Sequence, residues 1–141
     1  MISYFDTSAV IPLILDEPTS DRCDQLWNES VRVISSRLIY PEARAALAQA
    51  RRLHRINLAQ LTSTVDELES TVMEIDFVEV TASVARAAGE IAETNGLRGY
   101  DAVHLASAAL ALDDDFIFVT GDLELSAAAR SIGMAVALMA S

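Results

Sequence analysis

Four acidic residues stand at positions where carboxylates could act together. Asp6 follows a short apolar run near the N-terminus, and Asp122 follows another apolar run late in the chain. Glu42 and Asp101 come at the start of Ala- and Leu-rich stretches that favour helix. Ligands of open parallel sheets bind beyond the carboxyl ends of the strands, and the helices return from that same edge. We therefore expect all four carboxylates to lie on one functional edge.

Each acid also has an ordinary interpretation taken alone. Asp6 could cap the helix that follows it, and Asp122 could be a turn residue. Glu42 and Asp101 could interact favourably with the dipoles of their helices. If the four meet, however, they repel one another and need a cation. Carboxylate oxygens are hard ligands that suit Mg²⁺ or Mn²⁺, and such a cluster suits phosphodiester hydrolysis, because a metal ion can activate water and stabilise charge on phosphate oxygens.

Two other acidic sites fit the chain less well. Receiver domains place an Asp after a strand but also need a late Lys, and all ten basic residues of this chain are Arg. Phosphatases with an aspartyl nucleophile show Asp-x-Asp after the first strand, whereas the third position here is Ser8. A metal-dependent phosphatase is therefore a disfavoured alternative.

Strand-like and helix-like segments alternate along the chain, which predicts an α/β fold whose parallel sheet is covered on both faces. Pro12 is expected in the first turn of its helix, and Pro41 in the first position of another. Strands are expected at 2–5, 31–35, 75–80, 116–119 and 135–139. Helices are expected at 8–15, 20–29, from 41 through the Arg-rich segment, 57–73 with Asn57 as cap, 81–94 with Thr81 as cap, 99–112 and 124–131.

Length and composition limit the class of protein. The 141 residues suit one domain with a full core, and the net charge of −11 does not suggest a nucleic-acid binder. The single Cys23 cannot form an internal disulfide, and the N-terminus lacks the basic region of a signal peptide. No apolar stretch is long enough to span a bilayer. We expect a soluble, cytoplasmic protein.

The basic residues concentrate in one segment, which contains four of the ten arginines. This segment could guide an RNA backbone towards the acids, or it could be a solvated helix face that pairs with local acids. Arg98, close to Asp101, is a second candidate partner for phosphate or carboxylate. His104, one helical turn after Asp101, is interpreted as a packed and hydrogen-bonded residue, with contact to substrate or to a carboxylate as the other possibility. The four clustered arginines are Arg44, Arg51, Arg52 and Arg55.

Four motifs in order resemble those of a known family. The chain carries FDTSAV at 5–10, YPEARAAL around Glu42, LRGYDAVHLASA at 97–108 and FIFVTGDLEL at 116–125. These are similar to the successive motifs of PIN-domain ribonucleases, most closely those of the VapC toxins of bacterial VapBC toxin–antitoxin pairs. The resemblance covers nearly the whole chain. It implies a three-layer α/β/α fold with a short central parallel sheet, in a single PIN-like domain over 1–141.

Site roles follow from the resemblance at matching positions. Asp6 and Asp101 would be the principal ligands of Mg²⁺ or Mn²⁺, and Glu42 and Asp122 would complete the acidic pocket, directly or through water. Some relatives carry a further acid after the last motif, and Glu124 is the nearest candidate for it, so the number of metal ions stays open. Ser8 and Thr120 match hydroxyl positions that support such sites.

The resemblance implies an endoribonuclease toxin that cuts a structured RNA, tRNA or rRNA, and so inhibits translation. It also implies a homodimer and a VapB-type antitoxin that covers the active site and carries the binding to operator DNA. Attack by a metal-activated water predicts a 5′-phosphate and a 3′-hydroxyl at the cut. The alternative is a catalytically weak PIN-like binding module that acts mainly in an autoregulatory complex with its antitoxin.

Overall fold

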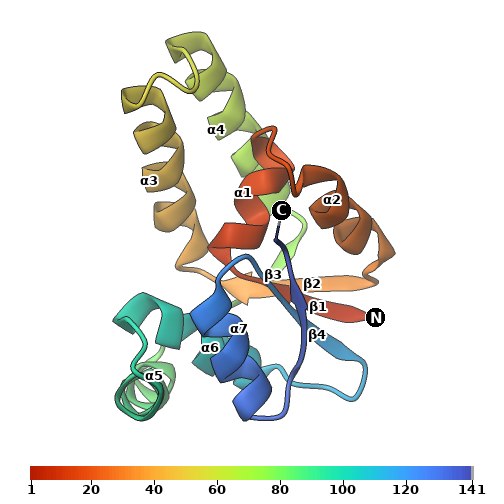
Figure 1. Ribbon diagram of the computed structural model, residues 1–141, viewed down its shortest axis with the longest axis vertical. Coiled ribbons are helices and arrows are strands. Elements are labelled where there is room, and N and C mark those ends of the chain that lie inside the picture. The colour runs from red at the N-terminus through yellow and green to blue at the C-terminus, as the bar shows by residue number, and fades with distance from the viewer. Residues whose placement is uncertain (141) are drawn as a thin grey trace.

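A computed structural model of the chain describes residues 1–140, whose strands form one parallel sheet (Figure 1). The strand order is β3-β2-β1-β4-β5, so that the first strand lies at the centre. The predicted α/β architecture with a parallel sheet is confirmed. The strands are β1 (Ile2–Phe5), β2 (Arg32–Ser36), β3 (Ile75–Val78), β4 (Phe116–Thr120) and β5 (Ala135–Leu138).

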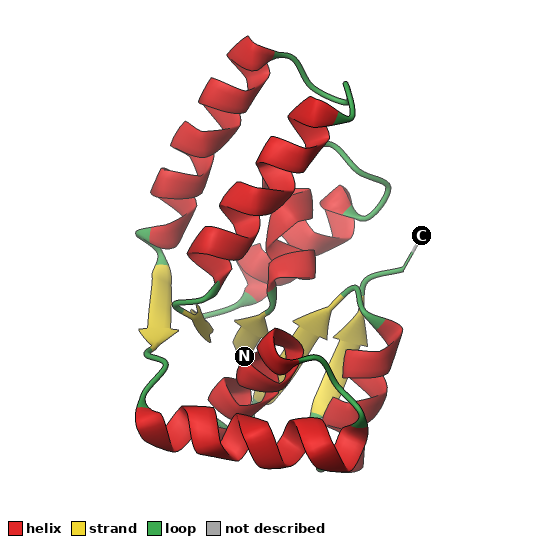
Figure 2. Cartoon of the chain, turned by 90° about the vertical axis from the view of Figure 1, so that its left-hand side faces the viewer, coloured by secondary structure: helices red, strands yellow, loops and turns green. Residues whose placement is uncertain are grey.

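Helices cover both faces of the sheet, and Figure 2 shows the strands between the two helical layers. Alternation along β1 divides the core: Phe5 packs with residues of α1–α4, and Tyr4 packs with residues of α5–α7 on the opposite face. No helix within residues 1–140 combines the length and the apolar composition that crossing a bilayer requires. The helices are α1 (Thr7–Ile14), α2 (Ser20–Glu29), α3 (Ile39–Arg52), α4 (Leu58–Val72), α5 (Ala82–Asn95), α6 (Gly99–Leu110) and α7 (Leu123–Ser131).

The topology creates a switch point next to the central strand. The chain moves from β1 outward through β2 to β3, and then returns to the other side of β1 as β4. Phe5 at the end of β1 is in register with Val119 of β4, so both strands deliver their next residues to one edge. In open α/β sheets this crevice beyond the carboxyl ends is where ligands bind.

Several helix starts agree with the capping signals in the sequence. The side chain of Asn57 accepts from the backbone N–H of Gln60, whose own side chain accepts from the N–H of Asn57 in a capping box. Thr81 caps α5 with a single bond, in which its side chain accepts from the N–H of Val84. Gly96 ends that helix in the left-handed region, with φ of 64°.

The positions of two prolines differ from the prediction. Because Asp6 caps α1, the helix begins at Thr7, and Pro12 is its sixth residue and not part of its first turn. Pro12 therefore removes the hydrogen bond that an N–H would donate to the carbonyl of Ser8. The helix α3 begins earlier than predicted and includes Pro41 as its third residue. This position is tolerated because the first four N–H groups of a helix have no partner within it.

Candidate active site

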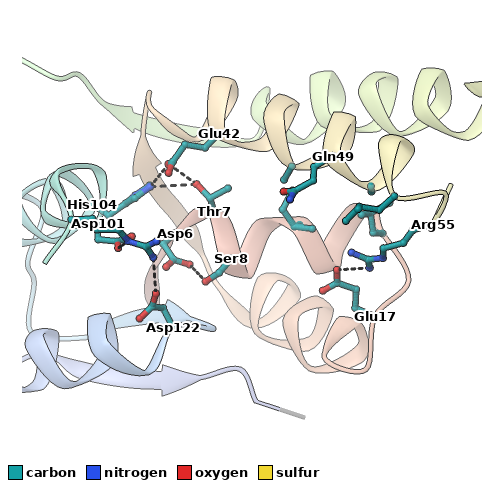
Figure 3. A pocket seen from close by; sticks show the side chains of 16 residues that line it. Asp6, Thr7, Ser8, Glu17, Glu42, Gln49, Arg55, Asp101, His104 and Asp122 are labelled. Atoms are coloured by element: carbon teal, nitrogen blue, oxygen red, sulfur yellow. Dashed lines mark hydrogen bonds and ion pairs between the residues drawn. The ribbon is translucent and has the colours of Figure 1, made fainter.

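The four acids predicted to act together line one cavity of about 680 Å³ (Figure 3). Asp6 is the cap between β1 and α1, and Asp122 is the cap before α7. Glu42 and Asp101 lie in the first turns of α3 and α6, whose N-termini face the carboxyl edge of the sheet. The four carboxylates therefore meet at this edge, as the sequence predicts.

Asp6 is the most buried of these acids, with 3% of its surface exposed. Its Oδ1 accepts from Ser8 Oγ at 2.7 Å and from the N–H of Ala9 at 3.1 Å. Its Oδ2 accepts from Thr120 Oγ1 at 2.6 Å. Burial raises the pKa of Asp6 above its usual value, and the charge of His104 and these hydrogen bonds offset part of the rise.

The two hydroxyl residues expected to support the site therefore both bond to Asp6. Ser8 belongs to α1 and Thr120 ends β4, so their donors reach the same carboxylate from two elements. Ser8 Oγ also accepts from the N–H of Gly121 at 2.7 Å, and Thr120 Oγ1 accepts from the N–H of Asp122 at 3.1 Å. These bonds connect the loop after β4 to the loop after β1.

Glu42 ends a chain of hydrogen bonds that starts in the core. Its Oε1 accepts from Thr7 Oγ1 at 2.8 Å and lies 2.7 Å from His104 Nε2. On the other side of the ring, His104 Nδ1 lies 2.8 Å from the hydroxyl of Tyr4. Burial raises the pKa of Tyr4 well above its usual value, so Tyr4 stays protonated. Because a carboxylate oxygen accepts, Nε2 donates to Glu42.

Both interpretations of His104 describe part of its environment. Its side chain is buried and hydrogen-bonded, and its bonding partner is one of the four acids. Sequence reasoning missed Tyr4 and Thr7 as parts of this chain of bonds. The position of His104 one turn after Asp101 was the available signal, because it placed the ring on the face of α6 that carries Asp101.

Asp101 and Asp122 share the guanidinium of Arg98. Arg98 Nε is 3.3 Å from Asp101 Oδ2, and Arg98 Nη2 is 4.0 Å from Asp122 Oδ2. Burial raises the pKa of Asp101, and the nearby negative charge of Asp122 raises it further. Asp122 Oδ1 accepts from the N–H of Leu125, as a helix cap does. Asp122 therefore caps α7, and Asp101 lies in the first turn of α6, where a negative charge is favourable.

The clustered arginines do not all reach this cavity. Arg55 lines it and pairs with Glu17 at 3.3 Å, at the far end from the acids (Figure 3). Arg51 shares a neighbouring hollow with Arg55, whereas Arg52 is exposed and lines neither hollow. Arg44 donates to the hydroxyl of Tyr40 at 2.8 Å.

Sequence reasoning also missed the length of the cavity, which continues between α1 and α3 away from the acids (Figure 3). Apolar side chains from Ile11, Leu15 and Leu53 line this part, together with Gln49. Glu124 is absent from this lining and instead borders a separate hollow beside α5.

The chemistry of the donor set fits a hard divalent cation. Among residues 1–140, no donor reaches Glu42 Oε2 or Asp101 Oδ1, and a single donor reaches Asp6 Oδ2. Within the same residues, Asp122 Oδ2 has only the 4.0 Å approach of Arg98. Within residues 1–140, no three His, Cys, Asp or Glu side chains are already gathered to hold a metal ion. In this arrangement the guanidinium of Arg98 partly balances the negative charge of Asp101 and Asp122.

Comparisons with known proteins agree with this fold. The PIN domain family model matches residues 3–131. The chain is 40% identical to Ribonuclease VapC45 of Mycobacterium tuberculosis over 134 residues, which cover 95% of this chain and 93% of that protein. The chain therefore belongs to the PIN domain family.

Two solved structures share the fold at lower identity. VapC20 of Mycobacterium tuberculosis, described as a Sarcin-Ricin loop cleaving toxin, matches with a TM-score of 0.68 and 19% identity over 89% of this chain and 94% of that one. VapBC2 of Rickettsia felis, bound to a DNA fragment from its promoter, matches with a TM-score of 0.65 and 16% identity over 99% and 100% of the two chains.

Removal of the Tyr4 hydroxyl tests the buried chain of hydrogen bonds. Tyr4→Phe leaves His104 Nδ1 without its hydrogen-bond partner in the interior, so we expect the free energy of unfolding to fall by about 1–3 kcal/mol. Urea denaturation measures the change. Tyr40→Phe is the matched control, because that hydroxyl bonds Arg44 and Glu69 at the surface, and should cost less than about 0.5 kcal/mol. Equal losses in the two variants would contradict the buried chain.

The raised pKa of Asp101 predicts a pH dependence of stability in metal-free protein. Because folding favours the protonated acid, its stabilising contribution is complete below the unfolded pKa of about 3.9. That contribution is lost as pH rises through the folded pKa. We expect Asp101→Asn to be more stable than wild type near neutral pH, and the difference to shrink as the pH is lowered.

Thermal unfolding in EDTA, followed from acidic to neutral pH, measures this difference. Asp66→Asn, which alters an exposed carboxylate on α4, controls for the loss of one negative charge. A variant of Asp101 that is less stable at neutral pH, by a margin that grows as pH rises, would show that the pKa is lowered.

Proposed function

We propose that this protein is a divalent-metal-dependent endoribonuclease toxin of the VapC type, which cuts tRNA or rRNA and so inhibits translation. The observation that carries the proposal is the meeting of four carboxylates from β1–α1, α3, α6 and α7 in one cavity. Membership of the PIN domain family and the 40% identity to a ribonuclease support it. The proposal treats 1–141 as one PIN domain acting in the cytoplasm with Mg²⁺ or Mn²⁺.

In this proposal Asp6, Glu42, Asp101 and Asp122 hold the ion. A divalent ion in such a site lowers the pKa of water and offsets negative charge on phosphate oxygens. Ser8 and Thr120 keep the Asp6 carboxylate in one orientation, because they bond to different oxygens of it.

Thr7 and His104 perform the corresponding task for Glu42. Both bind Oε1, which leaves Oε2 free towards a ligand. The buried hydrogen-bond chain therefore fixes which oxygen of Glu42 is available. Pre-organised acids of this kind avoid reorganisation when charge develops on a substrate.

The proposed partners are a second copy of the chain and a VapB-type antitoxin that covers the cavity. DNA binding would come from the antitoxin, as the promoter-bound VapBC2 complex suggests by analogy. The long cavity with apolar walls offers such a partner a place to bind beside the acids. The alternative function, a catalytically weak binding module in an autoregulatory complex, would keep this partner and lack cutting.

RNA cleavage by purified, antitoxin-free protein tests the proposal. With total RNA we expect cutting in Mg²⁺ or Mn²⁺, none in EDTA, and products that carry a 5′-phosphate and a 3′-hydroxyl. Asp6→Asn and Asp101→Asn should each lower the rate by about a hundredfold or more, because each removes a charge that binds the ion. Gel electrophoresis and end-group analysis measure these results.

Asp66→Asn is the matched control for this assay and should cut like wild type, since Asp66 is exposed on α4 away from the cavity. Equal cutting by the folded Asp6 and Asp101 variants, or a 2′,3′-cyclic phosphate product, would contradict the nuclease mechanism. Tight antitoxin binding without any cutting would support the binding-module alternative.

We also propose that Arg44, Arg51, Arg52 and Arg55 guide the RNA backbone. Replacement of Arg51, Arg52 and Arg55 together by Gln should weaken RNA binding at low salt. Each lost phosphate contact should reduce the slope of log K against log salt by about 0.7–0.9. Fluorescence anisotropy at several salt concentrations measures both. A triple variant of Arg22, Arg86 and Arg130 removes the same charge elsewhere, and equal effects from the two triples would discard the patch.

A further inference from the structure

Arg98 is a basic side chain placed among the carboxylates of the site. It directly precedes α6, and its guanidinium lies within 4.0 Å of a carboxylate on α6 and another at the start of α7. Among the ion pairs of residues 1–140, no other arginine reaches any of the four acids. The guanidinium carbon also lies 5.2 Å from the centre of the Tyr100 ring.

The ion pairs of Arg98 with the two carboxylates are weak. The side chain of Arg98 is 68% exposed, and its contacts with Asp101 and Asp122 are longer than well-formed charged hydrogen bonds. Because the guanidinium is exposed, water and salt screen its attraction to the two partly buried carboxylates. Arg98 can therefore leave the two acids without disturbing the packed core.

Arg98 contacts oxygens that the proposed divalent ion also needs. Its guanidinium faces Oδ2 of Asp101 and Oδ2 of Asp122, two of the four acids that line the cavity. A guanidinium and a divalent ion bound to the same two carboxylates would repel each other. Binding of either one therefore disfavours the other.

We propose that Arg98 exchanges partners: it neutralises Asp101 and Asp122 in the metal-free protein, and it binds a phosphate oxygen of the RNA when a divalent ion is bound. This inference rests on the proposed nuclease function. The Tyr100 ring keeps the freed guanidinium beside the cavity, since guanidinium stacks on aromatic faces. A planar guanidinium can then bind two phosphate oxygens at once.

The first arm of the test measures Mn²⁺ binding without RNA. Arg98→Gln should bind Mn²⁺ about fivefold more tightly than wild type, as the loss of a weak competing ion pair predicts. Arg98→Lys keeps the charge and should restore the weaker binding. Isothermal titration calorimetry measures the affinities.

Arg130→Gln is the matched charge control, because Arg130 lies in the last turn of α7, about 12 Å along that helix from Asp122. At physiological ionic strength this separation exceeds the screening length of about 8 Å. The Arg130 variant should therefore leave Mn²⁺ affinity close to that of wild type.

The second arm measures how strongly Mn²⁺ and RNA binding are coupled. A short fluorescein-labelled RNA is titrated in EDTA and in saturating Mn²⁺, and its binding is read by stopped-flow anisotropy before the strand is cut, so that all four acids stay intact. The coupling factor is the ratio by which Mn²⁺ tightens RNA binding. We expect this factor to be about tenfold smaller in Arg98→Gln than in wild type, because no guanidinium is released to the phosphate. If Arg98 acted only through the overall charge of the protein, Arg98→Gln would leave this factor unchanged.

The outcomes separate this inference from the proposed function. An equal Mn²⁺ affinity in Arg98→Gln and wild type, or an unchanged coupling factor, overturns the exchange even if the enzyme cuts RNA. Tighter Mn²⁺ binding in Arg98→Gln, with no RNA binding or cutting by wild type, overturns the transfer to phosphate and the nuclease function together. Changes in both arms support the exchange.

Discussion

The constraint on which the site depends is the cost of holding the Asp6 carboxylate inside the protein. Water reaches little of this side chain, so Ser8, Thr120 and the N–H of Ala9 supply most of its hydrogen bonds. These donors come from α1 and from the end of β4, which can meet only if β1 and β4 pair in the observed register. The residual cost appears as the raised pKa of Asp6. The parallel pairing at the sheet centre therefore keeps the acid in place.

Helix capping and ligand binding use the same atoms in this site. Asp6 and Asp122 each cap a helix through one oxygen, and each retains bonding capacity on the other oxygen. The ordinary and the functional interpretation of such an acid are therefore compatible. A helix start at the carboxyl edge of a parallel sheet supplies both a dipole that favours negative charge and a side chain aimed at the crevice.

The sequence allowed the sheet, most helix limits and the meeting of the acids to be predicted, because alternation, capping residues and strand ends are local signals. Asn57 and Thr81 show this for helix caps. The bond between Tyr4 and His104 joins residues 100 positions apart and depends on which face of β1 carries Tyr4 and on the packing of α6 against that face. Only the packed chain shows such a contact. The position of Pro12, in contrast, could have been predicted, because a helix capped by Asp6 already puts Pro12 beyond its first turn.

The distribution of arginine explains how a chain with net charge −11 could accept a polyanion. Arg98 lies at the acidic end of the cavity and Arg55 at the other, and each already pairs with a carboxylate. Neither guanidinium is therefore a free positive charge in the unliganded protein. RNA would have to exchange with Asp101, Asp122 or Glu17 to contact them. Affinity for RNA in such a cavity would depend on which cation already neutralises the acids, and a divalent ion bound there would release Arg98 for the RNA.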